Sequence, residues 1–121
     1  MSKKAVLIVD DEPDILDILK VSLEGEGFQC HLALDGKKAL DVFKQNKIQF
    51  IISDRKMAVM GGIELLIEIR KISKVPFLLF SNELRIEEDA IAIKLGASNI
   101  IRKPIDFELL FRLLKKADHK T

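Results

Sequence analysis

Phe50-Ile-Ile-Ser-Asp-Arg-Lys-Met-Ala-Val-Met-Gly-Gly62 is the stretch that decides the fold of this 121-residue chain. A mostly apolar run that leads directly into Asp54 is typical of a strand buried on both faces, and the double glycine that follows indicates a loop. Open parallel sheets bind their ligands just beyond the carboxyl ends of their strands. We therefore take Asp54 as the candidate reactive residue.

The segments on either side alternate between strand and helix patterns. Short apolar runs predict further strands at 5–9, 28–34, 77–80 and 99–102. Apolar residues at helical spacing predict helices over 13–25, from 36 to about 46, from 62, over 86–95 and from about 107. Short connections and right-handed crossovers then favour one doubly wound α/β domain, a parallel sheet with helices on both faces.

Composition excludes several classes of function. The formal net charge is +1, so no field of one sign draws the domain onto nucleic acid or anionic lipid. Cys30 is the only cysteine, which leaves no disulfide framework and no cysteine metal site. No apolar run is long enough to span a membrane or to form a signal peptide. We expect a cytoplasmic protein that binds neither nucleic acid nor membrane directly.

Four of the five predicted strands end in a chemically useful polar group. These groups are Asp10 and Asp11, Asp54, Ser81 and Lys103. Turns prefer Asp and Ser, so each one alone is weak evidence. Because all strand ends of a parallel sheet lie on one edge, we expect the four to converge.

Such a cluster needs cations. Two carboxylates about 5 Å apart repel by about 3 kcal/mol at an effective dielectric of about 20. Lys103 supplies one positive charge, and an oxygen-only ligand set with open positions favours Mg²⁺ for the rest. The chemistry that suits this assembly is phosphoryl transfer onto a carboxylate nucleophile, with Mg²⁺, Lys103 and the Ser81 hydroxyl stabilising the transferring oxygens.

From Lys4 to Lys116 the chain resembles a response-regulator receiver domain of two-component signalling. The residues that carry the resemblance are Asp10, Asp11, Asp54, Met57, Gly62, Ser81, Gly96-Ala97 and Lys103-Pro104. The resemblance implies a flavodoxin-like (βα)5 fold with strand order 2-1-3-4-5. It also implies Mg²⁺, a backbone carbonyl ligand from Lys56, a cis Lys103–Pro104 bond, and a phosphohistidine donor on a sensor histidine kinase or phosphotransfer protein.

The chain departs from the family pattern near the acceptor. Arg55 replaces an apolar residue, Ala58 a common proline and Gly61 a frequent aspartate. Asn82 replaces a small residue, so its side chain could crowd the phosphoryl site and slow the entry of water. Ile100 stands where the family often carries a switch tyrosine or phenylalanine.

One pair of charges suggests a gate. Lys56 lies two residues after the acceptor and Glu83 two residues after the predicted hydroxyl. We predict that they face each other across the site mouth and form a salt bridge that controls access to Asp54. Two separate solvated charges are the alternative.

The resemblance predicts a single receiver domain, residues 1–121 with a core of about 4–116, and no output domain. Phosphorylation would switch the face built by the fourth helix, fifth strand and fifth helix, for binding of an unknown output domain or downstream protein, or for homodimerisation. Alternatives are a degenerate receiver that only binds partners, a carboxylate-nucleophile phosphohydrolase and a flavin carrier. Such hydrolases carry a second aspartate where Lys56 stands, and Asp10-Asp11-Glu12 would repel a flavin phosphate.

Apolar residues off the inward stripes of the last two helices leave a second choice open. Leu109, Leu113 and Ile93 either widen the core stripe or form an apolar docking face.

Overall fold

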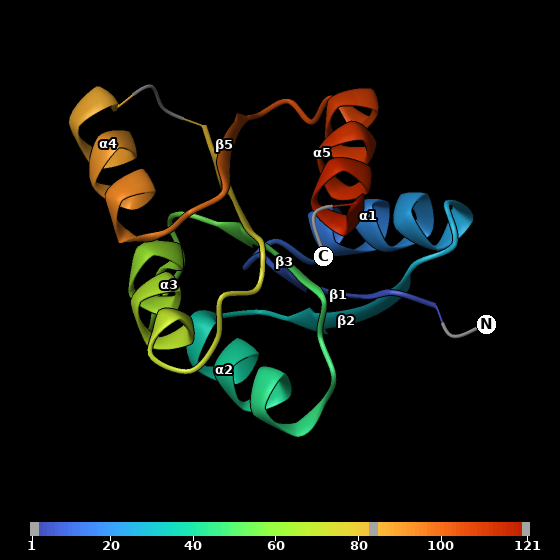
Figure 1. Cartoon of the computed structure of the whole chain (residues 1–121), viewed down its shortest axis with the longest axis horizontal. Helices are drawn as coiled ribbons and strands as arrows, with labels where there is room; N and C mark the ends of the chain where they lie inside the picture. The colour runs from blue at the N-terminus through green and yellow to red at the C-terminus, as the bar shows by residue number, and fades with distance from the viewer. Residues whose placement is uncertain (1–2, 83–84, 120–121) are drawn as a thin grey trace.

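The computed structural model describes residues 3–82 and 85–119, which form a five-stranded parallel sheet flanked by five helices (Figure 1). The strands are β1 (Ala5–Val9), β2 (Gln29–Ala33), β3 (Phe50–Asp54), β4 (Phe77–Ser81) and β5 (Asn99–Arg102), in the order β2-β1-β3-β4-β5. The helices are α1 (Pro13–Gly25), α2 (Gly36–Gln45), α3 (Gly62–Arg70), α4 (Ile86–Leu95) and α5 (Phe107–His119). The predicted fold class and strand order are confirmed.

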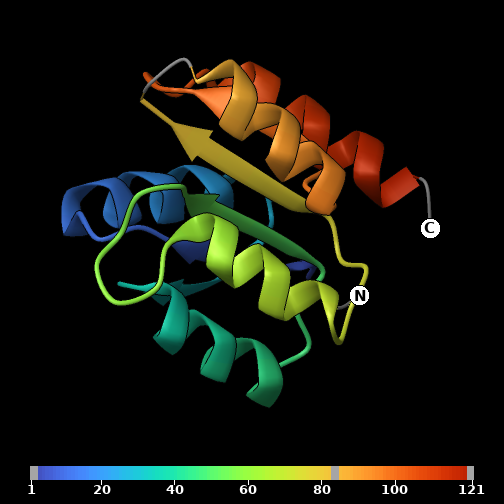
Figure 2. The same cartoon turned by 90° about the vertical axis from the view of Figure 1, so that its left-hand side faces the viewer.

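Alternate residues of the central strands enter two separate cores. Leu7, Ile51 and Phe77 pack with buried residues of α2, α3 and α4. Val6, Ile52 and Leu78, each one position along the same strands, pack with α1 and α5. Because successive side chains of a strand point to opposite faces, the unbroken apolar runs supply both cores at once. Figures 1 and 2 show the two helix layers on either side of the sheet.

The second strand is shorter than the predicted span of 28–34. The Phe28 N–H donates to the Leu23 carbonyl at 3.0 Å, so Phe28 still closes the end of α1 and the ladder begins at Gln29. Its ring nevertheless packs edge-on against Phe50, with 6.0 Å between centroids. An apolar side chain can pack in the core although its backbone forms no hydrogen bonds in the sheet. For this reason the apolar pattern predicted a strand that begins one residue too early.

The three apolar residues predicted either to widen the core or to form an exposed docking face differ in burial. Leu113 packs against the core between α1 and α5, whereas Ile93 is half exposed on α4. Leu109 is partly buried on α5. Within residues 3–82 and 85–119, no helix has both the length and the hydropathy to cross a membrane.

Candidate functional site

The polar residues predicted to converge lie together at the carboxyl edge of the sheet. Asp54 ends β3 and Ser81 ends β4, while Asp10 and Lys103 directly follow β1 and β5. The in-register pairs Val9–Ser53 and Ser81–Arg102 bring these ends level with one another. Parallel strands in this order place β1 and β4 beside β3, so the groups surround Asp54.

Three carboxylates form a compact cluster. One oxygen from each of Asp10, Asp11 and Asp54 lies within 4.8 Å of the others. Asp10 is 1% exposed and Asp54 9% exposed, whereas Asp11 faces solvent. The Glu12 N–H donates to Asp10 Oδ1 at 2.9 Å, which fixes the buried carboxylate. Two desolvated acids this close make the cluster a strong site for positive charge.

Lys103 supplies one such charge. Its Nζ lies 3.2 Å from Asp10 Oδ2 and 3.5 Å from Asp54 Oδ1. Burial alone would lower the pKa of the ammonium, but Asp54 and Asp10 together outweigh this and raise the pKa of Lys103. The lysine therefore stays protonated and bridges the two buried carboxylates.

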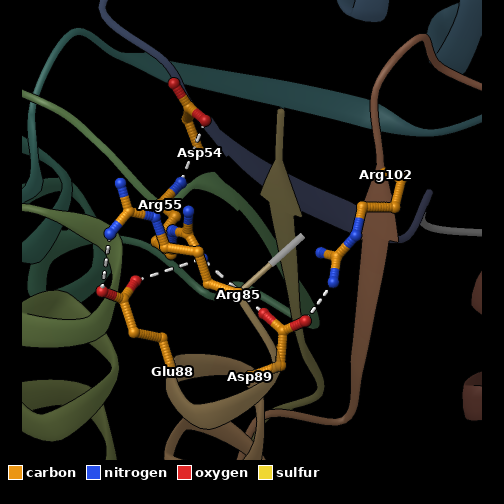
Figure 3. Close-up of polar contacts among 6 residues, drawn as sticks. All are labelled: Asp54, Arg55, Arg85, Glu88, Asp89 and Arg102. Atoms are coloured by element: carbon orange, nitrogen blue, oxygen red, sulfur yellow. Dashed lines mark hydrogen bonds and ion pairs between the residues drawn. The ribbon is translucent and has the colours of Figure 1, made fainter. Parts of the chain in front are cut away.

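Burial and the nearby Asp10 charge raise the pKa of Asp54, and Lys103 offsets them only in part. The Arg55 N–H donates to Asp54 Oδ1 at 3.0 Å and orients the carboxylate. The second oxygen points away from Arg55 in Figure 3. The site thus holds a carboxylate whose charge is incompletely compensated and whose orientation is fixed.

A cavity of about 260 Å³ opens over this carboxylate. It is lined by Asp11, Glu12, Asp54, Arg55, Lys56, Ser81 and Asn82. Lys56 and Asn82 therefore border the site, as predicted. The role of the Lys56 carbonyl as a metal ligand stays a prediction. Glu83 lies outside the described residues, so the predicted Lys56–Glu83 salt bridge stays a prediction as well.

The ends of β4 and β5 are tied together beside the cavity. Ser81 is 1% exposed, and its carbonyl accepts a hydrogen bond from the Lys103 N–H at 3.0 Å. The Lys103–Pro104 peptide bond is cis. Ile100 is partly buried on β5 and packs against the core on the α3 side of the sheet.

Gly62 is required by a close approach at the start of α3. A Cβ at this position would lie 2.3 Å from the Asp54 carbonyl oxygen. The Gly62 N–H also donates to the Arg55 carbonyl at 2.8 Å, so the loop returns to the strand end it left. A side chain here would displace the backbone that carries Asp54.

Arg55 lies next to Asp54, and no contact partner of its side chain was predicted from the sequence. Its side chain is 9% exposed, and its Nη1 lies 3.2 Å from Glu88 Oε2 and 3.6 Å from Asp89 Oδ1 on α4 (Figure 3). Asp89 also pairs with Arg102 at the end of β5. The only signal in the sequence was opposite charge at the ends of separate elements, which does not tell which charges meet.

The chemistry of the donor set fits a small divalent cation. Asp10, Asp11 and Asp54 offer hard oxygen ligands, and the open cavity leaves room for water and a phosphate oxygen as further ligands. With the Lys103 ammonium 3.5 Å from Asp54 Oδ1, the arrangement can stabilise a phosphoryl group attached to Asp54.

Comparison with known proteins gives a consistent result. The family model described as the response regulator receiver domain matches residues 6–115. The chain is 34% identical over 113 residues to the transcriptional regulatory protein ZraR of Escherichia coli, and 32% identical over 103 residues to the response regulator GtcR of Aneurinibacillus migulanus. These matches cover 93% and 85% of this chain but only 26% and 43% of those relatives.

A solved structure of similar length is that of the chemotaxis protein CheY4 of Vibrio cholerae. It superimposes with a TM-score of 0.88 at 29% identity, covering 96% of this chain and 99% of that one.

Proposed function

We propose that this chain, which belongs to the response regulator receiver domain family, accepts a phosphoryl group on Asp54 from a phosphohistidine of a sensor histidine kinase or phosphotransfer protein. The observation that carries the proposal is the cluster of Asp10, Asp11 and Asp54 with Lys103, in which Asp11 and Asp54 line an open cavity. A carboxylate so placed is a nucleophile with charge stabilisation already assembled around it.

In the reaction, a carboxylate oxygen of Asp54 forms a bond to phosphorus as the phosphorus–nitrogen bond to the donor imidazole breaks. The nitrogen keeps the electron pair, and the product is an acyl phosphate. The Arg55 N–H fixes the orientation of Asp54, and Lys103 supplies positive charge beside it. Ser81 lines the same cavity, and its hydroxyl would donate a hydrogen bond to a phosphoryl oxygen.

Asp10, Asp11, Asp54 and the Lys56 carbonyl would hold Mg²⁺, which when bound offsets negative charge on the transferring oxygens. Asn82 borders the cavity and would restrict water that attacks the acyl phosphate. The oxygen donors of the acidic cluster support the first role, and the position of Asn82 at the cavity supports the second.

The phosphorylated chain would act as a switch and not as a turnover enzyme. We propose that the face formed by α4, β5 and α5 changes its population of conformations and engages a downstream protein, an output domain or a second copy. The name of ZraR, a transcriptional regulatory protein, supports an output in gene regulation, carried by a part other than this domain. A cytoplasmic location would give access to the donor kinase.

Incubation with Mg²⁺ and acetyl phosphate, read out by intact mass, tests the proposal. The wild type should gain one phosphoryl group in a base-labile bond, because Asp54 is the one of the two carboxylates beside Lys103 that lines the open cavity. Asp54→Asn should gain none. Asp17→Asn is the matched control, since this exposed acid of α1 is no member of the cluster and should leave the gain intact.

Two other outcomes would favour the alternatives. If wild type folds but gains no phosphoryl group under these conditions, the chain acts only as an interaction module. Continuous release of phosphate from a phosphomonoester would instead indicate a hydrolase.

Omission of Mg²⁺, or Asp11→Ala, should prevent the gain of the phosphoryl group while leaving the circular dichroism spectrum unchanged.

A further inference from the structure

Arg55 connects the candidate acceptor carboxylate to the first turn of α4 (Figure 3). Its backbone N–H donates to Asp54 Oδ1 at 3.0 Å. Its buried guanidinium lies 3.2 Å from Glu88 and 3.6 Å from Asp89. A single residue therefore contacts both the site of proposed phosphorylation and a helix on the surface of the molecule.

A second path links the same two places through β5. Arg102, the last residue of β5, pairs with the other carboxylate oxygen of Asp89. The next residue is Lys103, whose Nζ lies 3.5 Å from Asp54. The contacts thus form a closed ring from Asp54 through Arg55, Asp89 and Arg102 back to Lys103, so a change at Asp54 reaches Asp89 from two sides.

The first turn of α4 depends on these ion pairs because the helix has little apolar contact. Ala92 is the only buried residue of α4, and Ile86, Ile91 and Ile93 are 73%, 53% and 50% exposed. The opposite end is held separately, by the Arg70 guanidinium on the Gly96 carbonyl at 2.8 Å. Loss of the ion pairs would free the first turn while the last stays anchored.

The contact between Arg55 and Asp89 rests on charge and not on aligned hydrogen bonds. Arg55 Nη1 and Asp89 Oδ1 are both shielded from solvent, and within the described part of the chain neither has a hydrogen-bond partner. Hydrogen-bonded ion pairs are the strong ones. A new anion that offers Arg55 well-aligned oxygens can therefore compete for it.

Arg55 also has space on both sides. It lines the cavity over Asp54, of about 260 Å³, and a neighbouring cavity of about 440 Å³ that is bordered by Glu64, Arg85 and Glu88. Arg55 and Lys56 are the residues that line both cavities. Open space beside Arg55 would allow its guanidinium to rotate from α4 toward Asp54.

We propose that Arg55 is an ionic latch that holds the first turn of α4 while Asp54 is unmodified and releases it when Asp54 is phosphorylated. This inference rests on the proposed function. A phosphoryl group adds negative charge and strong acceptor oxygens beside the Arg55 backbone, so the guanidinium exchanges Glu88 and Asp89 for the new anion. The α4 helix then turns about its anchored Gly96 end.

Amide hydrogen exchange followed by NMR tests the latch, with Mg²⁺ present and with or without beryllofluoride as the phosphoryl mimic. In the wild type, beryllofluoride should speed exchange of the amides of residues 90–93, which donate to the carbonyls of the first turn of α4, about tenfold. In Asp89→Asn these amides should already exchange about tenfold faster without the mimic, and the mimic should add little. Glu87→Gln, a neutralised acid in the same turn with an exposed side chain, is the matched control and should behave as wild type.

Equal α4 exchange in unliganded wild type and Asp89→Asn would overturn the latch. So would a wild type whose Asp54 loop resonances shift with beryllofluoride while α4 exchange stays constant. If those resonances do not shift at all, the proposed function fails, and the unliganded comparison still decides whether the ion pairs hold α4. Should Asp89→Asn not fold, Glu88→Gln removes the 3.2 Å pair with Arg55, together with the 3.4 Å pair with Arg85, and carries the same expectation.

Discussion

Asp54 carries a folding penalty that depends on pH. Its pKa is raised by burial first and by the Asp10 charge second. Because the folded chain holds this proton more tightly than the unfolded chain, the native state is favoured below the ordinary carboxyl pKa of about 4 and loses stability as pH rises through the raised value. The position of Asp54 in the cluster therefore lowers the stability of the folded chain at neutral pH.

We therefore expect Asp54→Asn to be more stable than wild type at pH 7 without divalent cations, by on the order of 1 kcal/mol. The difference should shrink as the pH falls toward 4, because protonation then removes the same charge from the wild type. Urea unfolding in EDTA at several pH values measures it. Asp17→Asn should show no such gain, and an Asp54→Asn variant without extra stability at pH 7 would contradict the argument.

Cys30 offers a second test at the level of one residue. Burial, with a smaller contribution from Glu24, raises the pKa of its thiol to about 11. We expect alkylation of the folded protein to accelerate roughly tenfold per pH unit from pH 8 to 10, because the thiolate fraction is still rising. The chain unfolded in urea, with an ordinary thiol pKa of about 8.5, should level off above pH 9. A plateau near pH 9 in the folded protein would show that the thiol is not desolvated.

Site residues can be predicted from the sequence where the position of the backbone alone brings them together. Asp10, Asp54, Ser81 and Lys103 could be brought together because each ends or follows a predicted strand, and strand ends of a parallel sheet share an edge. Arg55 is different. The partners of its side chain lie on α4, and a long side chain can reach several charges, so a pattern of charges alone does not select Glu88 and Asp89.

At the scale of elements, the loop between β3 and α3 contains the least favourable backbone position described. Val59 has φ 68° although it is β-branched, and it is 77% exposed. The Met60 N–H donates to the Ala58 carbonyl at 2.8 Å across it, which closes a tight turn. Left-handed backbone costs a residue with a Cβ about 1–2 kcal/mol. The exposed side chain returns little packing energy in exchange.

Val59→Gly should therefore raise the free energy of unfolding by up to about 1 kcal/mol, because glycine adopts positive φ without cost. The entropy that glycine adds to the unfolded chain makes this gain smaller. Ala58→Gly, one position earlier at a residue without positive φ, should lower it by up to about 1 kcal/mol. Urea unfolding of the two variants gives a comparison in which the signs oppose. Destabilisation by both would mean that Val59 is not strained.

The elements themselves were predictable because hydrophobic period and turn residues agree along most of the chain. Pro13 starts α1, and Gly96, at φ 113°, ends α4 in the left-handed conformation that glycine favours. The strained turn at Val59 was not predictable, because its sequence carries no glycine or asparagine that would mark positive φ. The close fit of Gly62 against Asp54 likewise becomes visible only in three dimensions.

At the scale of the whole molecule, the carboxylate cluster joins parts of the chain that are distant in sequence. Asp10 and Asp11 follow β1, and Asp54 ends β3, so a cation between them would connect two strands of the central sheet. Both cores are built on these same strands. Binding that exists only in the native state stabilises it against complete unfolding and not merely against fraying of a loop.

Addition of Mg²⁺ should accordingly raise the free energy of unfolding by about 2.7 kcal/mol when the free ion is a hundredfold above its Kd, with an unchanged urea m-value. Asp11→Asn should lose most of this gain, and because Asp11 is exposed its unliganded stability should stay close to that of wild type. Sodium chloride at equal ionic strength controls for screening, since general screening would act on both variants alike. If Mg²⁺ stabilised Asp11→Asn as much as wild type, the ion would be bound elsewhere, and the three acids would share an edge of the sheet without forming a metal site.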